Sequence, residues 1–344
     1  MKYLDDGVFA LLAEVADRAD QSIDWPTESM AALRTAGVLR WSIPTEFGGM
    51  GLKPVELLDG HREIAQACLT TAFILSQRES AVRQLTRGPK ALQERLLPAM
   101  ARGELFATVG LSQITTSRQH GGPALRAKKT ANGFRMDGDI PWVTGADQAG
   151  VVVVGATLED GKQVLAALPT DRRGVSIDPP LPLASLSGSH TASMRCAAIE
   201  IEHELILAGP TEKALGPVGG GGLETSDLAL GLAQAATEFL KNEAAIREDV
   251  LPVAERFQKA IDSSLVRLHA AATALIPETT LAVRVECTNL ALKATQAALL
   301  IAKGAGFVVP HLPQRLARQA LFFLVWSCPR PVAAGVLEAL TPIV

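Results

Sequence analysis

The chain has 344 residues, of which 48% are hydrophobic and 20% charged, with a formal net charge of −3. This length allows two or three domains, because a single core rarely grows beyond roughly 250–300 residues. The interspersed charges lack the clustered basic face of a nucleic-acid-binding protein. The amphipathic, acidic N-terminal stretch does not resemble a signal peptide, and no apolar run approaches the ~20 residues that span a bilayer. We therefore expect a cytoplasmic protein that binds neither nucleic acid nor membrane.

The four cysteines, Cys68, Cys196, Cys287 and Cys328, lie far apart in the sequence. Neither they nor the six histidines show the close spacing of a metal site. We expect free thiols in a reducing compartment and no bound metal.

Residues 1–104 are expected to form an N-terminal helical domain. Residues 43–52 interrupt the helical pattern with a proline and three glycines. Gly37 is placed to end a preceding helix. The expected helices are Asp5–Asp20, Glu28–Gly37, Pro54–Ala67, Leu69–Arg87 and Pro89–Ala101.

Residues 105–208 change to short alternating or β-branched runs, which predict a middle β domain. Asn132-Gly133 and Asp160-Gly161 lie between such runs and are typical of hairpin turns. The expected strands are Phe106–Leu111, Ala124–Lys129, Gly133–Asp137, Val151–Ala156, Gln163–Pro169 and Ala192–Ile201.

Residues 209–344 return to long helical patterns and are expected to form a C-terminal four-helix bundle. The run Gly219–Gly222 reads as a loop that enters this bundle, because no phosphate-binding motif accompanies it. The fold class is therefore α+β, with a β-barrel-like domain between two helical ones. The expected helices are Leu223–Ile246, Ala254–Leu275, Pro277–Lys303 and Pro313–Val325.

Four short motifs follow one another along the first two domains. They are the loop 43–52, the segment 93–104 with its Gln, Leu-Pro and Gly-Glu, the segment 138–146 with Pro-Trp-Val-Thr-Gly, and the strand 188–202. In this order, and with helical, β and helical blocks around them, they resemble the acyl-CoA dehydrogenase family. The resemblance extends over residues 28–330. It implies an FAD cofactor, an acyl-CoA-like substrate and a homodimer or homotetramer formed through the late helices.

The resemblance also assigns residues to the flavin. Trp142 corresponds to a family tryptophan that stacks near the isoalloxazine ring, and Thr144, across Val143, to a threonine that bonds near flavin N5. A tryptophan supplies a large apolar surface at low entropic cost. Taken alone, the same Pro-Trp-Val-Thr-Gly favours a core tryptophan beside a turn, and the surrounding architecture reverses that preference.

Two further segments carry weaker likenesses. Leu111 and Ser112 stand where the family presents a hydroxyl and a backbone N–H to the flavin pyrimidine edge, and Ser117 stands near its Gly-Ser-Asp. A polar surface loop is the alternative reading. Arg247 is the best match to the family's Arg-x-x-Phe-Gly, which reaches the FAD of a neighbouring subunit, although the aromatic residue is missing. Either FAD is held differently, or a smaller flavin binds, or the pocket has decayed.

The family's catalytic base is missing. Family members remove the substrate α-proton with a buried glutamate, and Ser327 occupies the expected position of that residue. A lone serine is not a base near neutral pH. Other members carry the glutamate on the first long C-terminal helix. Here Glu224 and Asp227 read most simply as charges at a helix N-terminus, and Glu238 as a solvated residue.

Three functions therefore remain open. The leading one is a flavin-dependent oxidoreductase that oxidises the Cα–Cβ bond of an acyl thioester or related substrate. The first alternative is a flavin-dependent monooxygenase on the same fold, because oxygenation needs no carboxylate base. The second is a non-catalytic relative that keeps the fold.

Overall fold

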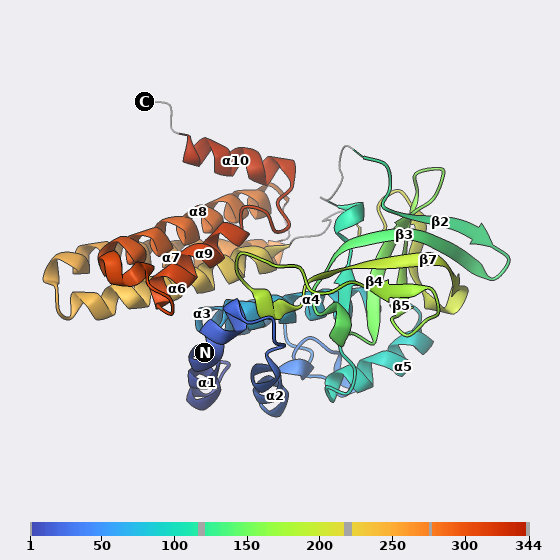
Figure 1. The fold of residues 1–344 in the computed structure, drawn as a ribbon, viewed down its shortest axis with the longest axis horizontal. Coiled ribbons are helices and arrows are strands. Elements are labelled where there is room, and N and C mark those ends of the chain that lie inside the picture. The colour runs from blue at the N-terminus through green and yellow to red at the C-terminus, as the bar shows by residue number, and fades with distance from the viewer. Residues whose placement is uncertain (1, 116–120, 217–221, 275–276, 342–344) are drawn as a thin grey trace.

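The computed structural model describes residues 2–115, 121–216, 222–274 and 277–341. Figure 1 shows the strands on the right, the C-terminal helices on the left and the N-terminal helices below them. This arrangement confirms the expected fold class of helical, β and helical blocks. Within the described residues, no helix is long and apolar enough to cross a membrane. The same residues contain no group of side chains that could hold a metal ion.

The N-terminal helices begin and end close to their expected positions. Asp5 caps the first helix by accepting a hydrogen bond from the Val8 amide at 2.9 Å. A proline at its first position and the Glu56 carboxylate, which accepts from the Lys53 amide, start the third. The bounds are α1 Asp6–Gln21, α2 Thr27–Thr35, α3 Pro54–Ala67, α4 Leu69–Leu85 and α5 Lys90–Ala101.

The middle block forms one mixed eight-stranded sheet in the order β6-β7-β3-β2-β4-β5-β8, with β1 parallel to β4. Two strands are additional to the expected ones, β6 and β8, and β8 ends at Thr211. Strand β3 runs six residues beyond its expected end, because bulges after Met136 and Ile140 carry the pairing past Gly138 and Pro141. The bounds are β1 Ala107–Gly110, β2 Leu125–Thr130, β3 Gly133–Val143, β4 Val151–Thr157, β5 Gln163–Pro169, β6 Val175–Ile177, β7 Ala192–Glu202 and β8 Ile206–Thr211.

The C-terminal helices pack against one another and against α3 and α4. Helix α6 approaches α3 closely at Gly231, where an added Cβ would lie 2.7 Å from the Arg62 carbonyl oxygen. The small residues of α6 therefore serve this packing. A short helix near the end of the chain, α10, was not expected. The bounds are α6 Leu223–Ala244, α7 Leu251–Ala274, α8 Pro277–Ala302, α9 Leu312–Phe322 and α10 Arg330–Leu340.

Helix α4 joins the two hydrophobic cores of the molecule. Its first half, including Phe73 and Leu75, packs with the N- and C-terminal helices. Its second half, including Val82 and Leu85, packs with the sheet and α5. Most of α4 is therefore buried, and the side chains on its remaining surface lie where the three blocks meet.

Candidate functional site

An aromatic cavity of about 500 Å³ opens where the sheet meets the helices. Its walls come from α4, the strands β1 and β3, the start of α6 and the segment that ends α9. Four rings face it, Phe73, Trp142, Phe322 and Trp326. We call it the aromatic cavity, and its volume lies in the usual range for cofactor and ligand sites.

The structure brings most of the predicted flavin residues together. Leu111, Ser112, Trp142 and Thr144 all line the aromatic cavity, and Ser327 lines it from the opposite, C-terminal side. These positions lie up to 216 residues apart in the chain, 327 minus 111. Their convergence in one cavity is what the resemblance implies for a flavin site.

Two of the predicted residues do not line that cavity. Val143 is fully buried in the sheet core. Arg247 donates to the Ile301 carbonyl oxygen at 3.2 Å, far along the helical bundle from the cavity walls. Ser117 lies outside the described residues.

The Pro-Trp-Val-Thr-Gly motif shapes one wall of the cavity. Side chains alternate along a strand, so Trp142 and Thr144 face the cavity while Val143 faces the core. Gly145 then turns the chain with φ of +63°, a conformation that favours glycine. Its amide donates to the Ser189 carbonyl oxygen at 2.9 Å, which fixes the turn. The indole of Trp142 remains 47% exposed beside the cavity.

A chain of three hydroxyl groups leads from the cavity into the protein. Thr144 Oγ1 lies 3.1 Å from Thr191 Oγ1, and Thr191 Oγ1 lies 2.9 Å from Ser189 Oγ. Thr144 and Thr191 line the cavity, whereas Ser189 is fully buried. Each hydroxyl can donate one bond and accept another, so the chain can orient the Thr144 hydroxyl toward a ligand.

Ser112 carries an unpartnered polar atom into the same cavity. Its Oγ is buried and has no hydrogen-bond partner among the described residues. The neighbouring Gln113 is structural, because its side-chain amide donates to the Gly110 and Gly155 carbonyl oxygens at 2.8 and 2.9 Å. These two bonds hold the single helical turn that presents Ser112. A buried hydroxyl without a partner is costly, so this position is suited to bind a polar ligand edge.

The C-terminal side of the cavity is an aromatic cluster. Phe322 and Trp326 stack with ring centroids 5.2 Å apart, and Phe73 meets each of them edge-on. Arg284 holds the backbone there by donating to the Phe323 and Trp326 carbonyl oxygens at 3.2 and 3.1 Å. Burial lowers the pKa of Arg284 to about 10, so the group stays charged at neutral pH. The expected base position thus presents a serine next to packed rings.

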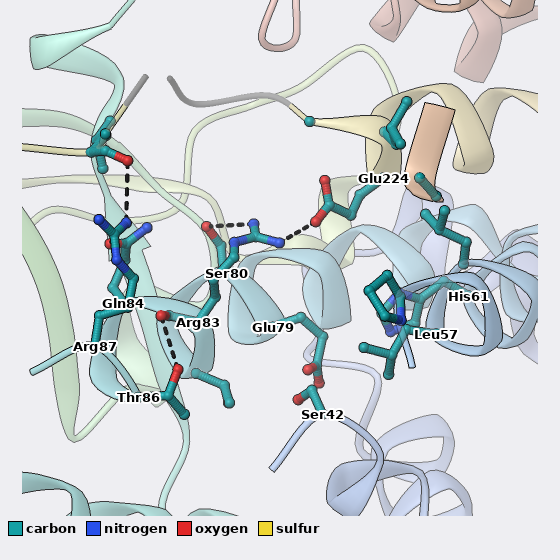
Figure 2. Close-up of a pocket in the computed structure, with 18 of the residues that line it drawn as sticks. Ser42, Leu57, His61, Glu79, Ser80, Arg83, Gln84, Thr86, Arg87 and Glu224 are labelled. Atoms are coloured by element: carbon teal, nitrogen blue, oxygen red, sulfur yellow. Dashed lines mark hydrogen bonds and ion pairs between the residues drawn. The ribbon is translucent and has the colours of Figure 1, made fainter. Parts of the chain in front are cut away.

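A second cavity of about 570 Å³ lies between α3, α4 and α6, and Figure 2 shows it. We call it the helical cavity. It shares wall residues with the aromatic cavity, so the two are adjacent. The shared residues are Ser80, Arg83, Leu111, Gly222 and Glu224.

Glu224 and Arg83 form an ion pair at the junction of the two cavities, as Figure 2 shows. Among the described residues, Glu224 is the one carboxylate that lines the aromatic cavity. Burial alone would raise the pKa of Glu224, but the Arg83 charge and the hydrogen bonds to the carboxylate outweigh it and hold that pKa below its usual value. The carboxylate is therefore ionised at neutral pH.

Sequence reasoning placed Glu224 at a helix N-terminus but missed its position in the cavity walls. Its partner on α4 lies 141 residues away in the chain, and no local pattern connects them. The other two α6 carboxylates that the sequence analysis considered do not line the cavities. Asp227 is fully buried and pairs with Arg62 at 3.1 Å, and Glu238 is exposed as expected.

The residues of the aromatic cavity fit a flavin ring. A planar tricyclic group needs an apolar face, which Trp142 offers, and partners for its polar edge, which the unpartnered Ser112 hydroxyl and the Thr144 hydroxyl offer. The cavity thus offers both an apolar surface for the face of the flavin ring and hydroxyl groups for its polar edge. Arg247, which the resemblance assigns to FAD, does not line this cavity, so the described residues identify no partner there for the diphosphate of FAD.

Comparison with known proteins points to one family. Residues 8–104 match the model of the acyl-CoA dehydrogenase N-terminal domain. A probable acyl-CoA dehydrogenase of Bacillus subtilis, YngJ, is 26% identical over 66% of this chain and 62% of its own length. All three comparisons indicate the acyl-CoA dehydrogenase family. The chain spans about three fifths of the length of the curated relatives it matches.

Two solved acyl-CoA dehydrogenase structures share the fold over nearly the full chain. Butyryl-CoA dehydrogenase from Megasphaera elsdenii has a TM-score of 0.85 at 16% identity and covers 98% of both chains. A glutaryl-CoA dehydrogenase from Mycobacterium smegmatis, solved in complex with FADH2, has a TM-score of 0.82 at 17% identity, covering 99% of this chain and 96% of its own. At these identities the likeness establishes the fold alone.

Proposed function

We propose that this chain is a flavin-dependent oxidoreductase that binds FAD in the aromatic cavity and oxidises the Cα–Cβ bond of an acyl thioester or a related small substrate. The observation that carries the proposal is the pair of adjacent cavities with an ionised carboxylate at their junction. One cavity suits a flavin ring and the other suits an acyl group. The FADH2 complex of the structural neighbour supports the choice of cofactor.

The cavity residues would hold the two ligands in contact. Trp142 would stack on the ring, while Ser112 and Thr144 would bond its polar edge. When bound, the flavin supplies the acceptor for the hydride that leaves Cβ. The rings of Phe73 and Trp326 would exclude water from the reacting atoms, which strengthens electrostatic interactions there.

Glu224 is the proposed base in place of the missing family glutamate. An α-proton next to a thioester carbonyl would pass to its carboxylate as the hydride leaves Cβ, which yields the α,β-unsaturated thioester. Arg83 keeps the carboxylate ionised but weakens it as a base. Proton removal is therefore expected to be slow unless the substrate draws Arg83 away. Ser327, at the expected base position, would instead position the thioester.

Exchange of the substrate α-protons tests this assignment. Butyryl-CoA is incubated with the FAD-reconstituted protein in D2O without an electron acceptor, and deuterium at Cα is followed by NMR. We expect exchange with the wild type and with Ser327→Ala, and at least a tenfold loss with Glu224→Gln. Glu28→Gln, which changes an exposed ion pair with Arg18, is the matched control. Unchanged exchange in Glu224→Gln would remove Glu224 from this role.

The spectrum of the flavin distinguishes the alternatives. Anaerobic bleaching by an acyl-CoA supports the dehydrogenase. Bleaching only by an external reductase, followed by rapid reoxidation in air, supports the monooxygenase. A protein that binds no flavin supports the non-catalytic relative.

We also propose that the chain forms a homodimer or homotetramer in the cytoplasm. Large apolar side chains stand exposed near the ends of the late helices, among them Leu300, Phe307 and Leu321. Exposed apolar groups of this kind are typical of protein interfaces. Free thiols at Cys68, Cys196 and Cys287, all buried, agree with a reducing compartment. Sedimentation analysis of the purified chain would measure its oligomeric state.

A further inference from the structure

The helical cavity contains a group of polar atoms that a purely hydrocarbon acyl chain would leave without partners. Its walls are largely apolar, with Leu57, Leu58 and Val82 among them. Of the polar side chains that also line it, we call Ser42, His61 and Glu79 the inner polar cluster. They belong to the loop before α3, to α3 and to α4, so the fold brings them together from separate segments.

Each member of the inner polar cluster has an unused hydrogen-bonding atom. His61 is 3% exposed and Glu79 6% exposed. The His61 Nδ1, the Glu79 Oε2 and the Ser42 Oγ atoms are buried and have no partner among the described residues. Figure 2 shows the Glu79 and Ser42 side chains pointing toward one another in the lower part of the cavity. Buried polar atoms without partners are uncommon in folded proteins and call for a ligand or water.

The charges around the cluster restrict what can bind there. Arg78 is almost completely buried and neutralises Glu79 through a contact of 2.8 Å, while also donating to the Leu39 and Met100 carbonyl oxygens. Burial lowers the pKa of His61, so its imidazole is neutral at pH 7. The cluster therefore consists of an already paired carboxylate, a neutral ring and a hydroxyl.

We propose that the helical cavity selects an acyl group that carries a hydroxyl on its chain, with Glu79 and Ser42 as the specificity-determining residues. The substrate hydroxyl would donate to Glu79 Oε2 and accept from the Ser42 hydroxyl, and His61 would supply a further bond. An alkyl chain satisfies none of these atoms. A terminal carboxylate would be repelled by Glu79, and an ammonium would add a second cation beside Arg78. This assignment of substrate class rests on the proposed function.

The thioester end of such a substrate would lie toward the junction with the aromatic cavity. Arg83 and Glu224 stand there, and Figure 2 places them on the opposite side of the cavity from Ser42. The apolar walls between them suit the methylene groups of a short chain. The hydroxyl is thus recognised away from the bond that is oxidised, which allows recognition and chemistry to be tested separately.

Binding affinities of matched thioesters test the inference without requiring turnover. The probes are butyryl-CoA, 4-hydroxybutyryl-CoA, 4-aminobutyryl-CoA and succinyl-CoA, titrated calorimetrically into the full chain with and without FAD. We expect the hydroxy compound to bind at least tenfold more tightly than butyryl-CoA, because a site built for a hydroxyl discriminates strongly against its absence. That preference should fall to threefold or less in Ser42→Ala and in Glu79→Gln. Ser29→Ala, another buried serine with an unpartnered Oγ but outside the helical cavity, should keep it.

The outcomes separate this inference from the proposed function. Equal or tighter binding of butyryl-CoA would overturn the inference and assign the cluster to bound water, while leaving the oxidoreductase proposal intact. Tighter binding of the amino or succinyl compound would overturn the hydroxyl assignment. A preserved hydroxyl preference in both Ser42→Ala and Glu79→Gln would overturn the role of those residues. Ser42→Ala removes a single oxygen and retains the Arg78–Glu79 pair, so this variant still tests the hydroxyl preference if Glu79→Gln fails to fold.

Discussion

Replacing Trp142 by alanine is expected to weaken flavin binding while leaving the protein folded. The indole is 47% exposed at the cavity, so of its roughly 250 Å² about 120 Å² is available to a ligand. A ring covering about half of that area would contribute ~1.5 kcal/mol at ~25 cal/mol per Å². Aromatic stacking adds about 0.5 kcal/mol or more. The sum of about 2 kcal/mol corresponds to roughly 30-fold weaker FAD binding.

The same substitution should cost the fold about 1.5–2.5 kcal/mol. A fully buried tryptophan typically costs ~3–5 kcal/mol when truncated, and only about half of this side chain is buried. FAD affinity is measured by the fluorescence change on titration, and stability by urea denaturation of the apo-protein. Phe307→Ala, an exposed aromatic that lines neither cavity, is the control and should leave FAD affinity unchanged. A folded Trp142→Ala protein with wild-type FAD affinity would refute the placement of the ring.

Three further substitutions test other parts of the structure. Ser112→Ala should leave the apo-protein equally stable or up to about 1 kcal/mol more stable, because the buried hydroxyl has no partner among the described residues. The same substitution should weaken FAD binding several-fold in the FAD titration. A clear loss of apo-protein stability would show that the hydroxyl is already bonded. Asp20→Ala should cost about 3 kcal/mol in urea denaturation, because this fully buried carboxylate accepts from the Leu186 amide at 3.0 Å and from Gln319 at 2.9 Å and pairs with Arg318 at 2.7 Å. The exposed Asp6→Ala is its control and should stay within about 0.5 kcal/mol. Burial raises the pKa of Asp227 well above its usual value. As pH rises above about 4, the unfolded chain therefore loses this proton before the folded state does. The contribution of Asp227 to stability is lost as pH rises through the folded pKa. Asp227→Asn should therefore gain stability relative to the wild type as pH rises, and equal pH dependence of the two unfolding free energies would contradict this.

Much of the fold follows from local patterns that the sequence displays. Pro54 fixes the start of α3, and a short apolar run between the Asp160-Gly161 turn and Pro169 indicates β5 at Gln163–Pro169. Strand β6 was not expected because it has only three residues, and β8 because its Gly-Pro pair reads as a turn. Both acquire strand geometry by pairing with longer neighbours, β7 and β5. Such pairing is a property of the tertiary structure.

In the candidate site, too, some residues are positioned by local sequence and others only by the tertiary structure. Trp142 and Thr144 of the Pro-Trp-Val-Thr-Gly motif line one cavity because a strand and a glycine turn determine their directions. Glu224 could not be recognised in this way, since its role depends on Arg83 of α4. The inner polar cluster likewise combines a loop and two helices, which no single stretch of sequence connects.

The visible spectrum of the purified chain during titration with FAD tests the central claim most directly. We predict one FAD per chain, with a shifted and structured flavin band that shows an ordered, apolar environment. The band should be lost or weakened in Trp142→Ala and unchanged in Phe307→Ala. A folded wild-type protein that leaves the FAD spectrum identical to that of free FAD at saturating concentration would contradict the flavin site, and with it the proposed oxidation chemistry.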